Sequence, residues 1–274
     1  MLKTEMRNPK TMKIHKMSTL EQLKVMSEEN ENAVRAVEAE LPHIEKAVNA
    51  ITNTLKAGGR LFYIGAGTSG RLGVLDACEC PPTFGVEPDT VIGIIAGGDI
   101  ALKQAQENVE DNPDAGIEDL KSYGFCKQDV LVGISAAGNA RYVTNAVEYA
   151  NLLGAITIGI TSNEESMLDR LSAISICTDT GAEVITGSTR LKAGTAQKLV
   201  LNMLSTVSMI QCGYVYENMM VNLKPTNNKL KMRMIGIVCE ILKCDEKKAE
   251  CLLNSYDWSI PAVVENTVGN YSSK

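Results

Sequence analysis

The feature that most constrains the fold is a short apolar run followed at once by a glycine-rich turn. Leu61–Ile64 carries only apolar and aromatic side chains, and the turn Gly65–Gly70 follows it directly. Such a run is typical of a strand that is buried on both faces. The next residues, Arg71–Cys78, favour a helix. Because a helix N-terminus carries free N–H groups and the positive end of the dipole, this turn is predicted to bind an anion.

Residues inside the turn suit a phosphate. Thr68 and Ser69 add hydroxyl donors, and Gly67 lets a ligand approach the backbone. The glycine spacing also matches a dinucleotide-binding fingerprint, but that site needs an acidic residue about 20 positions on, at the end of the second strand. The second predicted strand, Val91–Ala96, lies beyond that offset. A turn that only packs helix on strand is the other alternative, and it has no need of two adjacent hydroxyl residues. We therefore predict that Gly67, Thr68 and Ser69 contact a phosphate.

The pattern of apolar runs predicts an α/β fold with three layers, in which helices cover both faces of a parallel sheet. The predicted strands alternate with helical stretches such as Arg141–Leu153, and they lie at Leu61–Ile64, Val91–Ala96, Val130–Ser135, Ala155–Thr161 and Ile174–Cys177. Ligands of such sheets bind beyond the carboxyl ends of the strands. We therefore expect residues 65–70, 97–99 and 135–139 to converge on one mouth.

The two ends of the chain are predicted to be helical. A helix cap at Ser18 or Thr19 begins helices that continue to about Lys56. From Asn227 onward the pattern predicts three short helices, separated near Cys244 and Tyr256. The expected organisation is an N-terminal helical arm (1–56) packed on the core, an α/β sheet domain (57–222) and a small helical C-terminal subdomain (223–274).

Composition excludes several classes of function. With 33 acidic and 27 basic residues among 274, the net charge is -6, which argues against a general nucleic-acid binder. Neither a signal peptide nor a membrane-spanning run is recognisable, so we expect a cytoplasmic protein without a membrane partner. The eight cysteines include no CxxC pair, and they are expected to be reduced thiols. No metal site is predicted.

Three long stretches carry a resemblance to a known family. They are IGAGTSGRLGVLDACECPPTFGV, IAGGD and AEVITGSTRLKAGTAQKLVLNMLST. With them the chain resembles the N-acetylmuramic acid 6-phosphate etherases, which belong to the sugar isomerase (SIS) superfamily of phosphosugar-binding domains, and the similarity covers nearly the whole chain. The resemblance implies an SIS-type fold, a small phosphosugar as ligand, a homodimer, and a reaction that needs no cofactor.

The resemblance also selects two glutamates. Glu79 stands just before Pro81 and Pro82, a rigid pair that is expected to end the helix. Glu110 is predicted to lie on a helix that begins soon after Gly97 and Gly98. Taken alone, each glutamate is more often a solvated surface residue. In the family, the glutamates of the SECPPTF and EGAED motifs are the proposed acid/base pair, and they match Glu79 and Glu110 in CECPPTF and ENVED here. The implied reaction cleaves the D-lactyl ether by elimination across C2 and C3, followed by hydration. We assign Glu110 as the base and Glu79 as the acid.

A second hydroxyl-rich segment, Thr186–Lys192, precedes a long helix that is predicted from near Ala193 to Gln211. Residue types alone leave a capping loop and a ligand-binding loop equally open. The match to GSTRLKAGTAQK favours binding, and the residues that it implicates are Glu183, Ser188, Thr189 and Lys192.

The loop after the third strand departs from the family. Where the family has ASGRTPYV, this chain has Ala137 and Ala140 in place of a serine and a threonine. We expect the loss of these hydroxyls to weaken phosphate binding or to change its geometry, with Ser135, Asn139 and Arg141 as the residues that compensate.

Two other functions fit the same superfamily. One is a non-catalytic sensor of sugar phosphates, which has no need of both glutamates. The other is an aldose-ketose isomerase, which would leave the lactyl ether intact. Release of D-lactate separates the etherase from both.

Overall fold

The centre of the molecule is a parallel five-stranded sheet. The structure is a computed structural model that describes residues 2–106, 108–225 and 227–268. The strands have the order β2-β1-β3-β4-β5. They are β1 (Leu61–Gly65), β2 (Val91–Ile95), β3 (Val130–Ile134), β4 (Ile156–Thr161) and β5 (Ile174–Cys177). Each strand lies within one residue of its predicted bounds, so the apolar runs identified the sheet correctly.

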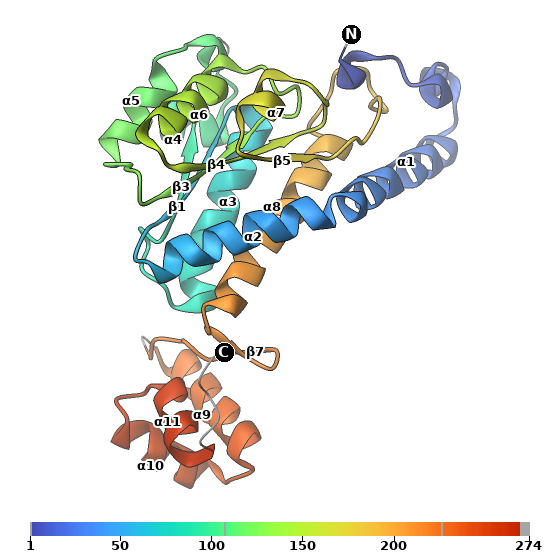
Figure 1. Cartoon of the computed structure of the whole chain (residues 1–274). Coiled ribbons are helices and arrows are strands. Elements are labelled where there is room, and N and C mark those ends of the chain that lie inside the picture. The colour runs from blue at the N-terminus through green and yellow to red at the C-terminus, as the bar shows by residue number, and fades with distance from the viewer. Residues whose placement is uncertain (1, 107, 226, 269–274) are drawn as a thin grey trace.

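Helices cover both faces of this sheet, as Figure 1 shows. Side chains alternate along β1, so Leu61 and Tyr63 join one apolar cluster, whereas Phe62 and Ile64 join another. The first cluster is completed by α1 (Thr19–Ala39), α2 (Leu41–Lys56), α3 (Gly67–Phe84) and α8 (Lys192–Gln211). The second is completed by α5 (Ala115–Ser122), α6 (Arg141–Leu153) and α7 (Met167–Leu171). The predicted three-layer α/β architecture is confirmed.

The chain begins with three short 3-10 turns that lead into the long helix α1. These turns are η1 (Lys3–Glu5), η2 (Pro9–Thr11) and η3 (Ile14–Lys16). Ser18 then caps α1, because its hydroxyl accepts a hydrogen bond from the N–H of Glu21 at 3.4 Å. The Glu21 carboxylate accepts from the N–H of Ser18 at 2.7 Å. This reciprocal capping box confirms the predicted start of the first helix.

Helix α3 is longer than the sequence predicted. Pro81 and Pro82 were expected to end it, yet the helix continues through both to Phe84. A proline pair removes two backbone N–H donors. Because Pro81 and Pro82 lie in the last turn of α3, few helical residues follow them, so the lost hydrogen bonds do not break the helix. Gly85 provides the actual stop, since it adopts the left-handed conformation (φ 66°) and its N–H bonds to the carbonyl of Pro81 at 2.9 Å.

A separate group of helices follows the sheet domain, at the bottom of Figure 1. The strands β6 (Val215–Tyr216) and β7 (Met219–Met220) form a small antiparallel pair before it. The helices are α9 (Asn228–Leu242), α10 (Glu246–Ser255) and α11 (Ile260–Val268), and they enclose an apolar cluster of their own. The three predicted helices are therefore present. None of the helices in the described part of the chain combines the length and apolar character that crossing a bilayer requires.

A very close approach of two glycines fixes the start of α3 against β1. A Cβ atom on Gly65 would lie 2.7 Å from the backbone nitrogen of Gly70, and one on Gly70 would lie 2.6 Å from the carbonyl oxygen of Gly65. Neither position has room for a side chain. Gly67 has a different reason for being glycine, because its φ of +55° is left-handed while the space around it is open.

We expect Gly70→Ala to destabilise the protein by about 1–3 kcal/mol, because the added methyl group meets backbone on one side and Ile95 on the other. Gly236→Ala is the matched control: Gly236 lies in α9 with open space around it, and its replacement should stabilise the helix by about 0.5–1 kcal/mol. Urea unfolding measures both. Equal stability of Gly70→Ala and the wild type would contradict the close contact.

Candidate functional site

A cavity of about 450 Å³ opens at the carboxyl edge of the sheet. That volume lies within the range of small-molecule sites. Five segments from distant parts of the sequence supply its walls. The residues that line it are Glu5, Ala66, Gly67, Thr68, Ser69, Glu110, Asp111, Ile134, Ser135, Ala136, Ala137, Asn139, Ala140, Gly187 and Thr189. The loops after β1 and β3 therefore meet here, as the sequence predicted.

The start of α3 supplies most of the hydrogen-bond donors in this cavity. The backbone N–H groups of Gly67, Thr68 and Ser69 precede the first helical bond, which joins the N–H of Gly70 to the carbonyl of Ala66. Within the described residues these three N–H groups have no acceptor, and no side chain caps the helix. Ser69 Oγ donates to Gln197 Oε1 at 3.0 Å, which leaves the Thr68 hydroxyl as the side-chain donor nearest this turn. Together they form a site for an anion.

The loop after β3 adds two further polar groups. Ser135 Oγ accepts a hydrogen bond from the N–H of Gly138 at 3.1 Å, so its own proton is available to a ligand. Asn139 Oδ1 accepts a hydrogen bond from the N–H of Met167 at 3.1 Å. Because the amide oxygen faces Met167, the NH₂ group of the same amide, which carries two donors, points away from Met167. Ser135 and Asn139 both line the cavity.

The charge of the lining is unusual for a phosphate site. Among the described residues it contains the carboxylates of Glu5, Glu110 and Asp111 but no lysine or arginine. An anion must therefore be held by neutral donors and the dipole of α3, at the end of the cavity where those donors gather. The carboxylates, which only accept hydrogen bonds when ionised, suit the hydroxyl and amide groups of a ligand.

Glu110 reaches this cavity from a short 3-10 turn, η4 (Val109–Asp111), rather than from the helix that was predicted to carry it. The expected helix after β2 is α4 (Gly98–Lys103), which ends before Glu110. Gly97–Asp99 were predicted to reach the same mouth but do not line the cavity. Asn108 precedes η4 with a left-handed φ of 63°, which starts the turn immediately before Glu110.

Glu79 does not line this cavity. It lies 12 residues after Gly67 on the continuous helix α3, and its side chain is exposed. At the rise of an α-helix, that separation places it about 18 Å along the axis from the donors at the helix start. Within one chain, the two predicted glutamates therefore lie at different ends of the sheet domain.

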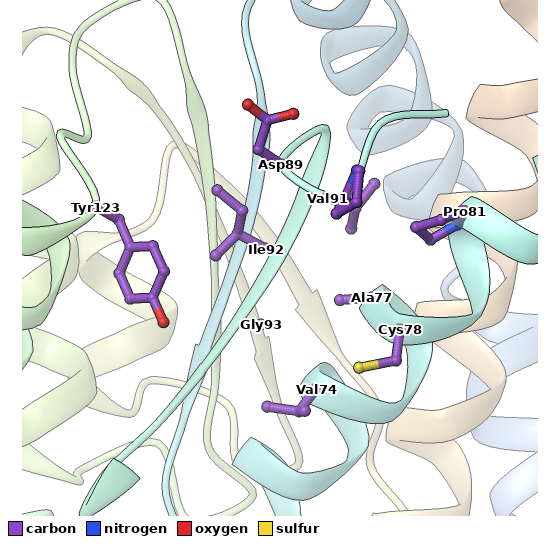
Figure 2. A pocket seen from close by; sticks show the side chains of 10 residues that line it. Val74, Ala77, Cys78, Pro81, Asp89, Val91, Ile92, Gly93 and Tyr123 are labelled. Atoms are coloured by element: carbon purple, nitrogen blue, oxygen red, sulfur yellow. The ribbon is translucent and has the colours of Figure 1, made fainter. Parts of the chain in front are cut away.

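A second cavity of similar volume, about 450 Å³, is lined by Cys78, the residue before Glu79 on α3 (Figure 2). Its walls come from α3, from the edge strand β2 and from Tyr123, and Cys78 and Pro81 frame it on the helix side. The lining is largely apolar, and among the residues that the structure describes Asp89 is the only charged one in it. This groove therefore suits an apolar surface better than a phosphate.

The segment before α8 divides into residues that line the cavity and residues that are buried beneath it. Thr189 and Gly187 line the cavity, but Ser188, Glu183 and Lys192 do not. Glu183 is fully buried and accepts hydrogen bonds from the N–H groups of Lys192 and Ala193, at 3.1 and 3.0 Å. It thus caps the start of α8.

Lys192 was predicted to contact the ligand, but its ammonium group points into the protein. It is 1 % exposed and lies 2.6 Å from Glu29 on α1 and 2.8 Å from the carbonyl of Ala182. Glu29, which is 2 % exposed, also accepts hydrogen bonds from Asn8 at 2.8 Å and Lys10 at 2.9 Å. A buried charge is stable only when it is paired, and this network pairs it.

These contacts control the ionisation of Glu29. Burial alone would raise its pKa, but the hydrogen bonds from Lys192, Lys10 and Asn8 outweigh burial and lower the pKa to about 2. A carboxylate whose pKa falls on folding stabilises the folded state above its unfolded pKa, near 4.5. This stabilisation is therefore complete above about pH 4.5 and is lost as the pH falls towards 2.

We expect Lys192→Met to destabilise the protein by about 3–5 kcal/mol, because it leaves the Glu29 carboxylate buried without its nearest counter-charge. Lys198→Met, which removes an exposed lysine from the same helix, is the matched control and should change stability by less than about 0.5 kcal/mol. Urea unfolding at pH 7 provides both values. A Lys192→Met protein as stable as the control would show that the pair contributes little.

Ala137 and Ala140, which replace hydroxyl residues of the family motif, both line the cavity, so the departure falls on the site itself. No group of three or more His, Cys, Asp or Glu residues suitable for a metal ion occurs in the described ranges.

Comparison with known proteins finds similarity to SIS domains and to N-acetylmuramic acid 6-phosphate etherases. Residues 43–151 match the model of the glucokinase regulatory protein N-terminal SIS domain, and residues 123–207 match that of the SIS domain. The N-acetylmuramic acid 6-phosphate etherase of Clostridium beijerinckii is 49 % identical over 96 % of this chain and 86 % of its own length. That of Actinobacillus pleuropneumoniae is 53 % identical over 90 % of this chain and 81 % of its own length.

Solved structures share the fold at low sequence identity. The phosphoheptose isomerase GmhA from Neisseria gonorrhoeae has a TM-score of 0.55 and 18 % identity, covering 70 % of this chain and 98 % of its own. A phosphoheptose isomerase from Francisella tularensis has a TM-score of 0.54 and 20 % identity, covering 71 % of this chain and all of its own. These similarities establish the SIS-type fold.

Proposed function

The chain belongs to the N-acetylmuramic acid 6-phosphate etherase family, and we propose that it cleaves the D-lactyl ether of N-acetylmuramic acid 6-phosphate. The products are N-acetylglucosamine 6-phosphate and D-lactate. The observation that carries the proposal is the identity of 49 % over 96 % of the chain to such an etherase. The anion site at the start of α3 supports it independently, because the substrate is a phosphate ester.

The phosphate binds at the start of α3 in this proposal. The N–H groups of Gly67, Thr68 and Ser69 and the hydroxyl of Thr68 donate to its oxygens, while Ser135 and Asn139 donate from the facing loop. The sugar ring then extends from these donors towards Glu110. This direction follows from charge, since a dianionic phosphate is attracted by the donors at the start of α3 and repelled by the carboxylates in the lining.

Glu110 acts as the base. It removes the proton from C2 of the sugar while the bond between C3 and the lactyl oxygen breaks, and a second carboxylic acid protonates that oxygen as D-lactate leaves. Water then adds across the C2–C3 double bond, so that a hydroxyl group takes the place of the lactyl ether at C3. The two carboxyl groups exchange their acid and base roles in this second step. No cofactor takes part.

The second carboxyl group in this scheme is Glu79, contributed by a second copy of the chain. In one chain about 18 Å of helix separates Glu79 from the start of α3, whereas the two groups must act on adjacent carbon atoms. An isologous dimer solves this problem, because each copy can bring its Glu79 to the cavity of the other.

The surface around Glu79 fits such a dimer. Leu75 and Pro82 lie one turn before and about one turn after Glu79 on α3, and the exposed fraction of Leu75 is 55 %. The apolar groove between α3 and β2 adjoins the same helix (Figure 2). Exposed apolar surface of this kind is typical of sites that a protein partner covers.

The first test measures D-lactate released from N-acetylmuramic acid 6-phosphate. We expect release by the wild type and a loss of at least about 100-fold in kcat for Glu110→Gln, because the amide cannot accept the C2 proton. Glu118→Gln, an exposed glutamate on the nearby helix α5, is the control and should retain activity. Tight binding without lactate release by the wild type would indicate a sugar-phosphate sensor, and interconversion of an aldose and a ketose phosphate would indicate an isomerase.

The second test asks whether the active site is shared. Glu79→Gln and Glu110→Gln chains with different affinity tags are co-expressed, and dimers that carry both tags are isolated. Each mixed dimer should contain one cavity with both glutamates and one with neither, so activity should recover to about half that of the wild type. Each variant alone stays inactive. Mixed dimers as inactive as their parents would exclude a contribution of Glu79 from the second copy.

A further inference from the structure

The cavity contains a carboxylate that the sequence did not indicate. Glu5 lines it from the 3-10 turn η1, 60 positions before the glycine turn begins at Gly65. It lies opposite the loop that precedes α8, because a methyl group on Gly187 would stand 3.2 Å from Glu5 Oε2. No lysine or arginine forms an ion pair with Glu5 among the described residues, so its charge is not neutralised by a neighbour.

Buried contacts hold the backbone on both sides of Glu5. On one side Thr4, which is 1 % exposed, accepts a hydrogen bond from Asn163 Nδ2 at 3.2 Å. The same Nδ2 donates to the carbonyl of Ala136 at 2.9 Å, and Ala136 lines the cavity. Glu5 is thereby tied to the loop that carries Ser135.

On the other side Asn8 is buried and donates to Glu29 at 2.8 Å and to the carbonyl of Ala182 at 3.1 Å. The paired charges of Glu29 and Lys192 in turn hold the start of α8. Anchors at Thr4 and Asn8 leave little freedom to the backbone between them. Glu5 is therefore presented to the cavity by a fixed segment, which lowers the entropy cost of binding through its side chain.

The chemistry of a carboxylate limits what Glu5 can bind. An ionised carboxylate accepts hydrogen bonds and donates none, so it repels the phosphate group. Hydroxyl and amide N–H groups of a sugar are donors, and they form charge-assisted bonds with a carboxylate. The donors at the start of α3 take the phosphate, so the groups near Glu5 belong to the sugar.

We propose that Glu5 is a substrate-binding carboxylate that accepts hydrogen bonds from hydroxyl or amide N–H groups of the amino sugar and so sets the orientation of the ligand. This inference rests on the proposed function for the identity of the sugar. Glu5 discriminates between the two ends of the ligand: it attracts the donor-rich sugar and disfavours a phosphate bound in the reverse direction.

The test compares the binding of two ligands, N-acetylglucosamine 6-phosphate and inorganic phosphate, by titration calorimetry of the full chain. The variants are Glu5→Ala and Glu5→Gln, and the control is Glu38→Gln, which changes an exposed glutamate on α1. Loss of one hydrogen bond to a charged group should weaken binding of the sugar phosphate about tenfold or more in Glu5→Ala, and less in Glu5→Gln. Affinity for inorganic phosphate should stay the same or increase.

Three outcomes would overturn the inference: unchanged affinity of Glu5→Ala for the sugar phosphate, a parallel loss of affinity for both ligands, or a wild type that binds phosphate but not the sugar phosphate. A parallel loss would mean that Glu5 only supports the fold of the cavity. A wild type that binds the sugar phosphate through Glu5 but releases no D-lactate would reject the etherase proposal and leave this inference intact.

Discussion

The close contact between Gly65 and Gly70 is the constraint on which the cavity depends. Because neither residue has a side chain, α3 can begin immediately beyond the carboxyl end of β1, with the backbones almost touching. The first N–H groups of the helix then have no acceptor in the described chain and point to the carboxyl edge of the sheet. An anion site that contains no lysine or arginine is possible only because this arrangement collects several neutral donors at one helix start.

A buried ion pair fixes a second wall of the cavity. Lys192 holds Glu29 on α1, Glu183 caps the start of α8, and Asn8 joins the first turns of the chain to the same group. The wall that contains Gly187 and Thr189 is thereby attached to two helices and to the N-terminal segment. A buried pair of this kind adds little stability over an apolar pair of the same shape, but it requires one arrangement of its partners. Here that arrangement positions the loop at the cavity.

Much of the fold could be predicted from local sequence. The strands are apolar runs bounded by glycine and polar residues. The helices are indicated by the spacing of their apolar residues and by capping residues at their ends. Both signals are local, so these elements depend little on distant contacts. The contacts of Thr68, Ser69, Ser135 and Asn139 with the cavity also follow from a general property of parallel sheets, in which loops at the carboxyl ends of the strands meet. The resemblance to a family supplied Glu110, which sequence patterns alone would not distinguish from a surface residue.

The positions that the sequence did not predict depend on geometry over longer distances. Glu79 was expected beside the anion site, whereas the continuous helix α3 carries it about 18 Å along the axis from that site within one chain. Lys192 was predicted to face the ligand because nothing in its neighbourhood in sequence identifies Glu29 as its partner, 163 positions away. Glu5 was missed for the same reason, since only the folded chain brings the first turns to the cavity.

The position of Glu29 links the beginning of the chain to its catalytic half. Lys10 and Asn8, near the start, share this one carboxylate with Lys192, so the N-terminal turns and the start of α8 become ordered together. A protein cleaved after the first dozen residues would keep its entire sheet and yet lose both Glu5 and two of the partners of Glu29. Removal of this segment would therefore take away one carboxylate of the cavity and leave Lys192 as the remaining charged partner of Glu29.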